Sequence, residues 1–268
     1  MVRLKTIEVQ MQEAPDKQVS LTDPDSRSMK SRGNGIVGYN VQTAVEAEHH
    51  LIVAHEVTNQ GSDRSQLSPM AKQADEAMDA ENLTVIADAG YYKSEELLSC
   101  HEAGITANVP RPLTSANQAK GLFRRKDFHY KPEQDEYRCP AGERLIWRMT
   151  SEENGLKLHR YWSSNCKTCS LKSQCTRGRE RRVTRWEHET ILEAMQDRLD
   201  CDSEIMRIRR QTVEHPYGTL KLWMGSTHFL TRTMNRVSTE MSLHVLAYNL
   251  KRVMNILGTK PLIQAIQA

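Results

Sequence analysis

The sequence predicts an α/β fold in which helices flank a mixed sheet and a basic, Cys-rich insertion interrupts the order. Three observations predict it. Residues 37–110 follow the order hairpin, helix, strand, helix, strand, which is typical of a mixed sheet with helices packed on it. Residues 111–187 break this pattern and are loop-rich. Residues 188–268 return to a helical pattern that completes the fold.

Composition excludes several classes of protein. The chain has 268 residues, with 37 Lys and Arg against 34 Asp and Glu, and 38% hydrophobic residues. These values are ordinary for a globular protein and exclude wholesale disorder. No apolar run approaches the roughly 18 residues of a membrane span, and the N-terminus has no apolar signal core. We therefore expect a cytoplasmic protein that does not contact a membrane.

The first half of the predicted sheet follows a polar N-terminal segment. Residues 1–36 are weakly patterned and end in loop-forming residues. Residues 38–46 alternate with a β-rich composition and residues 51–57 are a short apolar run, so together they predict a β-hairpin. Residues 64–79 carry apolar side chains at three- and four-residue steps, which predicts a helix that Ser62 or Asp63 would cap.

The second half of the predicted core begins with residues 83–87, a compact buried-strand candidate. Residues 93–102 predict a helix that Gly104 ends, and residues 105–109 predict a last strand. Near the C-terminus, residues 240–257 place an apolar stripe on one helical face, and Gly258 follows as a stop.

Asp88 is the first candidate for chemistry. It directly follows the strand candidate 83–87 and precedes two small residues, Ala89 and Gly90. A carboxylate at the C-terminal end of a buried strand lies where an open sheet places its ligands, and the small residues would let a metal or substrate approach. The alternative is that Asp88 only caps a turn or helix.

A second candidate is the charged segment around Glu214. On a helix, Arg210, Glu214 and Lys221 fall within roughly 40° of one another. The alternative is a solvated, salt-bridged stripe. The apolar neighbours Val213 and Leu220 indicate packing instead, and Pro216 is expected to end or bend the helix after Glu214.

Four cysteines in the insertion have a spacing that favours metal binding. The pattern is C-x26-C-x2-C-x5-C, formed by Cys139, Cys166, Cys169 and Cys175. A CxxC pair holds two thiolates on one turn, and two more complete a tetrahedral zinc site. The alternative is a set of unconnected reduced thiols.

The insertion also carries dense positive charge. Residues 157–186 contain nine Lys and Arg residues, and Glu180 is their only acid. Basic residues interleaved with aromatic ones suit a phosphate backbone. We therefore expect DNA contacts from this segment, and the alternative is a charged surface loop. The residues that we assign to DNA binding are Arg177, Arg179, Arg181, Arg182, Arg185 and, outside the insertion, Lys221.

Three stretches together resemble the catalytic region of bacterial insertion-sequence transposases of the DDE class, which have an RNase H-like fold. The first runs from Asp23-Pro24-Asp25-Ser26-Arg27 to Gly38-Tyr39-Asn40-Val41-Gln42. The second is Val85-Ile86-Ala87-Asp88-Ala89-Gly90-Tyr91. The third, Arg210-x3-Glu214-x6-Lys221, fits the Tyr-x2-Arg-x3-Glu-x6-Lys signature of the family. The resemblance extends from about residue 18 to 258.

The resemblance implies Mg²⁺- or Mn²⁺-dependent cleavage and strand transfer of double-stranded DNA at transposon ends and target. Asp88 and Glu214 would bind the metal, and Arg210 and Lys221 would hold DNA phosphates near it. It further implies a bacterial, nucleoid-associated protein and a homodimer of the full-length protein. The Cys-rich segment falls where many members carry an insertion, and zinc would be structural there.

Two departures from the family pattern affect the expected activity. Arg207 stands at the signature's Tyr position, and no Asp-Gly-Thr-Lys-like motif supplies a first catalytic Asp. Asp23 and Asp25 lie in a Pro-containing loop and are not expected to replace it. We therefore expect a truncated catalytic region, weakly active or inactive alone, with one central strand position either empty or filled by residues 4–10. The alternatives are a non-catalytic, zinc-bearing DNA-binding module and a host nuclease of the same fold.

Overall fold

The computed structural model describes every residue except 1, 15, 32–33, 113–115 and 268. The chain forms two compact units. The first comprises residues 1–111 and 195–268, and the second comprises residues 112–194. The helices and strands of the chain confirm the mixed α/β class, and the first unit is consistent with an RNase H-like domain. No helix in the described part of the chain is long and apolar enough to cross a membrane.

The predicted β-hairpin is present in the first unit. Strand β3, Asn40–Val45, pairs antiparallel with β4, Ile52–Thr58. A short 3₁₀ turn, Asp63–Ser65, then leads into helix α2, Leu67–Met78, which packs against β4. Ser62 caps the 3₁₀ turn, because its side chain accepts a hydrogen bond from the backbone N–H of Arg64.

The predicted strand–helix–strand unit follows. Strand β5 spans Thr84–Ile86, α3 spans Ser94–Glu102 and β6 spans Thr106–Asn108, which pairs parallel with β5. Gly104 lies between α3 and β6 with φ +76°. This left-handed backbone conformation suits glycine at a helix end, because glycine has no Cβ to clash there.

In the described residues, the core strands of the first unit form two separate two-stranded sheets. Strands β3 and β4 form one two-stranded sheet, and β5 and β6 form another. Residues 4–10, the proposed filler of a central position, lie in helix α1, Val2–Glu13. A pocket of about 440 Å³ is lined by residues of both β3 and β5, and by helices α2 and α6. We call this pocket the strand slot.

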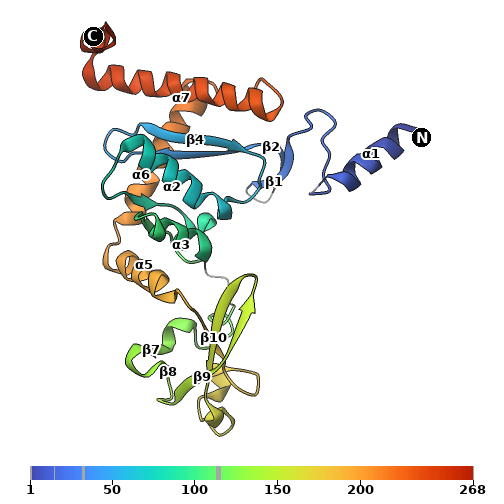
Figure 1. Ribbon diagram of the computed structural model, residues 1–268, viewed down its shortest axis with the longest axis vertical. Helices are drawn as coiled ribbons and strands as arrows, with labels where there is room; N and C mark the ends of the chain where they lie inside the picture. Colours follow the sequence, from blue (N-terminus) through green and yellow to red (C-terminus); the bar gives the residue numbers. More distant parts are fainter. Residues whose placement is uncertain (1, 15, 32–33, 113–115, 268) are drawn as a thin grey trace. The chain divides into compact units, whose positions relative to one another are not determined.

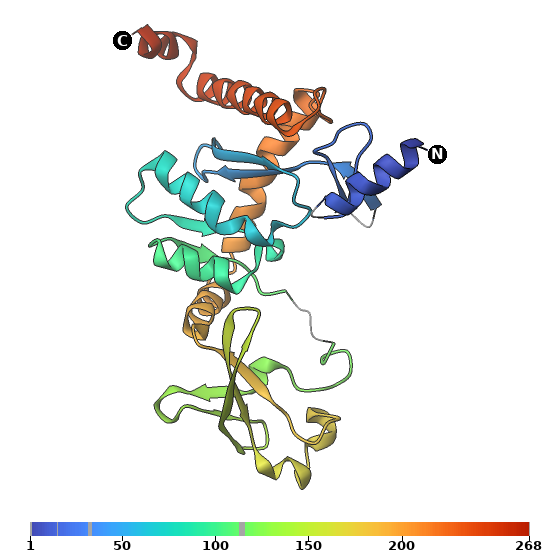
Figure 2. The same cartoon turned by 45° about the vertical axis from the view of Figure 1, so that its right-hand side comes forward.

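Three C-terminal helices and a π-helical turn complete the first unit. Helix α6, Ile205–Gly218, runs into the π-helical turn Thr219–Trp223 and contacts both β3 and β5. Helix α7, Met234–Leu257, lies along β4 (Figures 1 and 2). The core between them contains Ile52, Val57, Leu220, Val237, Met241, Val245 and Tyr248. Helix α8 spans Thr259–Gln267.

The apolar stripe that the sequence places on one face of α7 is not the buried face. Leu243, Leu246, Leu250 and Leu257 are all exposed. The helix packs instead through Val237, Met241, Val245 and Tyr248. Helix α7 is therefore apolar on two faces, and only one of them lies against the core.

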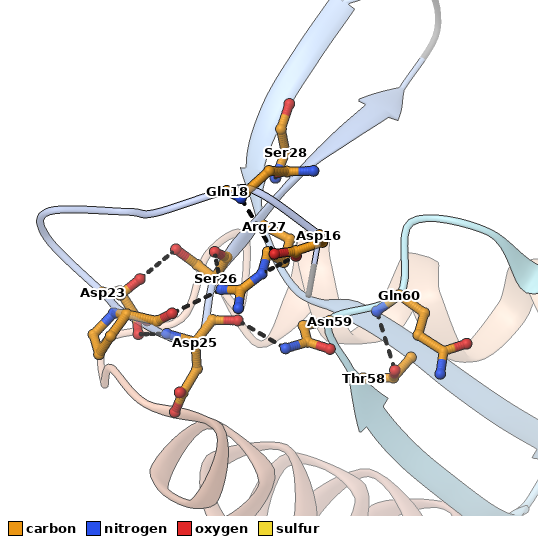
Figure 3. Close-up of polar contacts among 11 residues, drawn as sticks. Asp16, Gln18, Asp23, Asp25, Ser26, Arg27, Ser28, Thr58, Asn59 and Gln60 are labelled. Atoms are coloured by element: carbon orange, nitrogen blue, oxygen red, sulfur yellow. Dashed lines mark hydrogen bonds and ion pairs between the residues drawn. The ribbon is translucent and has the colours of Figure 1, made fainter. Parts of the chain in front are cut away.

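The N-terminal segment has more regular structure than the sequence indicates. Besides α1, it forms the hairpin of β1, Arg27–Ser31, and β2, Asn34–Gly38. Asp23 and Asp25 lie before β1 (Figure 3) and cap the start of α7. Asp23 is buried and accepts hydrogen bonds from the Thr233 backbone N–H and the Tyr39 hydroxyl, and Asp25 accepts one from the Met234 N–H at 2.8 Å. Both carboxylates are therefore used in holding the fold together.

The second unit is a five-stranded antiparallel sheet of order β11-β10-β9-β8-β7. The strands span His129–Lys131, Glu136–Arg138, Arg144–Glu153, Leu156–Trp162 and Val183–Trp186, numbered β7 to β11. Asn154 and Gly155 both have positive φ between β9 and β10, as a tight two-residue hairpin turn requires. Helix α4 spans Lys172–Cys175, and α5, Glu189–Cys201, begins in this unit and ends in the first. The segment predicted to be loop-rich thus contains a sheet with its own apolar core.

Candidate functional site

Asp88 lies two residues after β5 and begins a 3₁₀ turn, Ala89–Tyr91. Its Oδ1 accepts a hydrogen bond of 2.8 Å from the Gly90 backbone N–H. Its Oδ2 accepts one of 2.6 Å from Arg209 on α6, and the Asp88 side chain is 45% exposed. Asp88 is therefore a half-exposed carboxylate at the C-terminal end of a parallel strand, held in a fixed orientation by a backbone amide and an arginine.

The arginine that contacts Asp88 is Arg209, which the sequence analysis did not single out. Its neighbour Arg210 is the arginine that the resemblance assigns to DNA phosphates. Successive residues of a helix point about 100° apart. Arg209 turns toward the end of β5, whereas Arg210 is exposed. The charge at Asp88 is thus balanced by a residue that the signature does not include.

Glu214 lies about one helical turn after Arg210 and is exposed on α6. It lines a pocket of about 310 Å³ together with Arg209 and Tyr91, which we call the Glu214 pocket. This pocket adjoins the strand slot, because both are lined by Thr43, Tyr91, Arg209 and Val213. Glu214 and Arg209 therefore line one connected hollow beside β3 and β5. Asp88 lines neither pocket and is linked to the hollow through its ion pair with Arg209.

The helix that carries Glu214 does not end there, contrary to the expectation from Pro216. Helix α6 continues through the buried Pro216 to Gly218 and becomes π-helical from Thr219. Tyr217 fixes this part of α6 to the hairpin, because its hydroxyl donates a 3.0 Å hydrogen bond to the Val41 carbonyl. Lys221 follows on the π-helical turn, exposed, with its Nζ 5.6 Å from the Tyr217 ring centroid.

A buried polar network that the sequence did not reveal supports the Asp88 turn. Gln42 on β3 is buried, donates to Asp63 Oδ1 at 2.7 Å, and accepts a hydrogen bond from the Tyr91 hydroxyl. Asn40 donates to the same Asp63 oxygen at 2.7 Å. Burial, together with the negative charge of Asp63, raises the pKa of Tyr91. Tyr91 is therefore a neutral hydrogen-bond donor, and Asp63 places a second carboxylate beside the Asp88 turn.

The donor chemistry of this region suits a hard divalent cation, but the ligand set is incomplete. Carboxylate oxygens are the ligands that Mg²⁺ and Mn²⁺ prefer. Asp88 and Glu214 supply two carboxylates, and one oxygen of Asp88 already receives an arginine. In the described residues, no group of three or more His, Cys, Asp and Glu side chains is arranged to hold a metal ion.

The four predicted cysteine ligands lie around one small cavity in the second unit. Cys139, Cys166, Cys169 and Cys175 all line a space of about 20 Å³. The Gly142 backbone N–H donates a 2.8 Å hydrogen bond to the Cys139 carbonyl and so closes a tight turn after Cys139. Burial and the three neighbouring thiols raise the pKa of Cys175, against the opposing charge of Arg181. Cys201, by contrast, is exposed outside this cavity.

The five arginines that we assigned to DNA differ in their surroundings. Arg177 and Arg179 are exposed. Arg182 is exposed but pairs with Glu180 at 2.8 Å, and Arg181 lies over the Phe128 ring. Arg185 is buried, and its guanidinium forms two hydrogen bonds with Glu193 and lies 3.8 Å from the Tyr130 ring centroid. Arg185 thus stabilises the second unit, and its side chain is the least accessible of the five.

The first unit has the features of an RNase H-like domain: a hairpin, a strand–helix–strand unit and an acidic residue after the parallel strand. The chain belongs to the transposase DDE domain family, whose model matches residues 9–250. It is therefore a transposase domain, and its family acts on DNA and generally uses divalent metal ions. Neither a curated protein nor a solved structure matches the chain.

Proposed function

We propose that the chain is the catalytic region of a bacterial insertion-sequence transposase. It cleaves phosphodiester bonds at transposon ends and joins them to target DNA, in the cytoplasm at the nucleoid. The observation that carries the proposal is the position of Asp88 and Glu214. Asp88 follows a parallel strand, Glu214 lines the adjoining pocket, and Arg209 lies beside both.

Asp88 and Glu214 would hold Mg²⁺ or Mn²⁺. When bound, the metal would supply activation of the attacking oxygen and stabilisation of the leaving oxygen in an in-line displacement. The chain's own groups position the DNA. Arg210 and Lys221 are exposed on either side of Glu214 along α6 and the π-helical turn, and both would hold phosphate oxygens, Arg210 in a bidentate manner.

We further propose that this polypeptide alone is weakly active or inactive. The strand slot separates β3 from β5, so the central position of the sheet has no strand in the described residues. In the family, that strand carries the first catalytic Asp. Asp23 and Asp25 do not replace it, because they cap α7. A missing ligand misplaces the reacting groups, and small misplacements are costly in positioned chemistry.

The test is Mn²⁺-dependent nicking of DNA that bears a transposon end. We expect weak nicking by the unaltered chain, and its loss in both Asp88→Ala and Glu214→Gln. Glu76→Gln is the matched control, since Glu76 is an exposed helical glutamate on α2. Strong strand transfer by the chain alone would contradict the proposed weak activity. Residual nicking that survives Asp88→Ala and Glu214→Gln would contradict the proposed active site.

A structural zinc ion in the second unit is a separate proposal, favoured by the four cysteines around one cavity. Zinc would supply folding free energy to a unit rich in polar residues, and Arg177 and Arg179 would then contact DNA. The alternative function, a non-catalytic zinc-bearing DNA-binding module, rests on this same observation.

Co²⁺ substitution tests the zinc site, because a thiolate-ligated Co²⁺ gives strong charge-transfer absorption. We expect that signal, and one bound zinc per chain, to be lost in Cys166→Ser and kept in Cys201→Ser. Equal loss in both variants, or no bound metal in the unaltered chain, would contradict the proposal. DNA binding that persists while Mn²⁺-dependent nicking is absent would favour the non-catalytic module.

The exposed stripe of α7 supports the proposed homodimer of the full-length protein. Four leucines on one helical face are between 45% and 63% exposed, and most soluble oligomers are symmetric assemblies of identical chains. Leu246→Glu should shift the molar mass measured by light scattering from dimer to monomer. An unchanged mass would contradict this interface.

A further inference from the structure

A second pocket along α6 is not lined by Glu214 and has no part in the proposed metal site. It has a volume of about 250 Å³ and is formed where α6, the π-helical turn and α7 meet. His215, the residue after Glu214, lines it, together with Trp223 and side chains of α7. We call it the Trp223 pocket.

The Trp223 pocket is positively charged. Lys251 and Arg252 line it, and none of its lining residues is acidic. Lys251 is exposed. Arg252 is held in place, because its Nε donates to the His49 carbonyl at 2.9 Å and its Nη2 at 2.5 Å. A fixed guanidinium and a mobile ammonium, without a carboxylate between them, are suited to an anionic group such as a phosphate.

The pocket also offers neutral groups with defined hydrogen-bonding roles. The Tyr248 hydroxyl donates to the His50 carbonyl at 2.7 Å, so it accepts from His215 Nδ1 at 2.9 Å. His215 therefore carries its proton on Nδ1 and keeps Nε2 as an acceptor. Asn255 and Thr219 add an amide and a hydroxyl to the lining.

One wall of the pocket is an exposed indole ring. Trp223 is 81% exposed, so most of its surface has no protein contact. Leu222, its neighbour, is 83% exposed but does not line the pocket. Flat aromatic side chains beside cationic ones are the usual means by which proteins bind a nucleotide, since the ring stacks on a base and the cations hold its phosphate.

We propose that the Trp223 pocket binds one unpaired nucleotide of the DNA strand that passes Glu214. Its phosphate lies between Lys251 and Arg252, and its base stacks on Trp223. The volume of about 250 Å³ is close to the lower end of small-molecule sites, which fits a single partly enclosed nucleotide. The inference rests on the proposed function only in taking DNA as the substrate.

The experiment is a titration of the full chain with a fluorescently labelled oligonucleotide, followed by anisotropy without divalent metal, so that binding is separated from cleavage. Trp223→Ala is compared with Leu222→Ala, since both side chains are exposed and removing either costs little packing. We expect Trp223→Ala to weaken binding about tenfold or more, Leu222→Ala to change it less than twofold, and Trp223→Phe to restore most of it.

Charge is tested in the same assay. Lys251→Ala should make the negative slope of log affinity against log salt concentration shallower by about 0.7 to 0.9. Lys260→Ala is the control, an exposed lysine on α8 outside the pocket. Equal effects of Trp223→Ala and Leu222→Ala, or equal slopes for the two lysine variants, would overturn the nucleotide site.

The outcomes separate this inference from the proposed function. If nicking depends on Asp88 and Glu214 but the pocket variants bind normally, only the nucleotide site is wrong. If the pocket variants weaken binding but no metal-dependent nicking occurs, the nucleotide site stands and the catalytic proposal fails. If the unaltered chain binds no DNA, both are contradicted.

Discussion

Gly90→Ala should displace the Asp88 carboxylate with little effect on the rest of the fold. A Cβ at Gly90 would lie 2.9 Å from Asp88 Oδ1 and 3.7 Å from Asp63 Oδ2. Ordinary contact begins at 3.4 Å, so Oδ1 must retreat by about 0.5 Å. That movement weakens the 2.8 Å hydrogen bond from the Gly90 N–H, which itself holds Asp88 in place.

The energetic effect is modest for folding and larger for metal binding. One hydrogen bond contributes about 1 kcal/mol net to the free energy of unfolding. Because Asp88 is also half exposed, we expect the melting temperature to fall by no more than about 2–4 °C. Loss of a group that orients a metal ligand typically weakens metal affinity about 10- to 100-fold. Mn²⁺ affinity, measured by electron paramagnetic resonance of the free ion, should therefore fall about tenfold.

Gly38→Ala is the matched control, because a Cβ there meets no atom within 4 Å. Its Mn²⁺ affinity should equal that of the unaltered chain. If Gly90→Ala binds Mn²⁺ normally while Asp88→Ala does not bind it, the reasoning about the Gly90 contact is refuted. If the unaltered chain binds no Mn²⁺, the proposed metal site is refuted instead.

Three further changes test how the fold holds the site. Asp25→Ala removes the 2.8 Å hydrogen bond to the Met234 N–H at the start of α7, and should lower stability by about 1 kcal/mol in chemical denaturation. Arg185→Lys breaks the paired hydrogen bonds to Glu193 and should destabilise the second unit by about 1–3 kcal/mol. Burial acts to raise the pKa of Glu46, but three backbone N–H groups outweigh it and the pKa is lowered from 4.5. The ionised Glu46 side chain therefore stabilises the fold above pH 4.5, and this stabilisation is lost as the pH falls through the lowered pKa of Glu46. Glu46→Gln should therefore make the melting temperature decline less steeply below pH 4.5. Unchanged stability in the first two variants, or an unchanged pH profile in the third, would contradict these assignments.

The local elements of the first unit could be predicted because their signals are local. Alternation in residues 38–46 and the apolar run 51–57 predicted the hairpin of β3 and β4. The strand candidate 83–87 predicted β5, and so the position of Asp88 at its end. The pairing of these strands into sheets depends on what lies between β3 and β5, and no local pattern encodes that.

The arginine partner of Asp88 could not be identified from the sequence. The family signature includes Arg210, in a role toward DNA phosphates, and does not address Arg209. Only the packing of α6 against β5 determines which guanidinium reaches Asp88. Asp63 was missed for a similar reason, because its link to the site runs through Gln42, on a strand distant in sequence.

Helix α7 shows how an apolar stripe can mislead. Residues 237, 241, 245 and 248 form one apolar face, and the leucines at 243, 246, 250 and 257 form another. Both have helical periodicity, so the pattern alone cannot determine which one is buried. The core includes the face with Tyr248, whose hydroxyl also bonds the His50 carbonyl.

The Arg209–Asp88 ion pair is compatible with metal binding, although it is also what a purely structural Asp88 would show. The two side chains are 22% and 45% exposed, and an ion pair this accessible contributes about 0–1 kcal/mol. Releasing Arg209 would therefore reduce metal affinity by less than about fivefold, since 1.4 kcal/mol corresponds to a factor of ten. A divalent ion beside the carboxylates of Asp88 and Asp63 gains more electrostatic energy than one guanidinium does. If the proposed metal site is correct, we therefore expect the incomplete ligand set of the described residues to limit metal affinity more than Arg209 does.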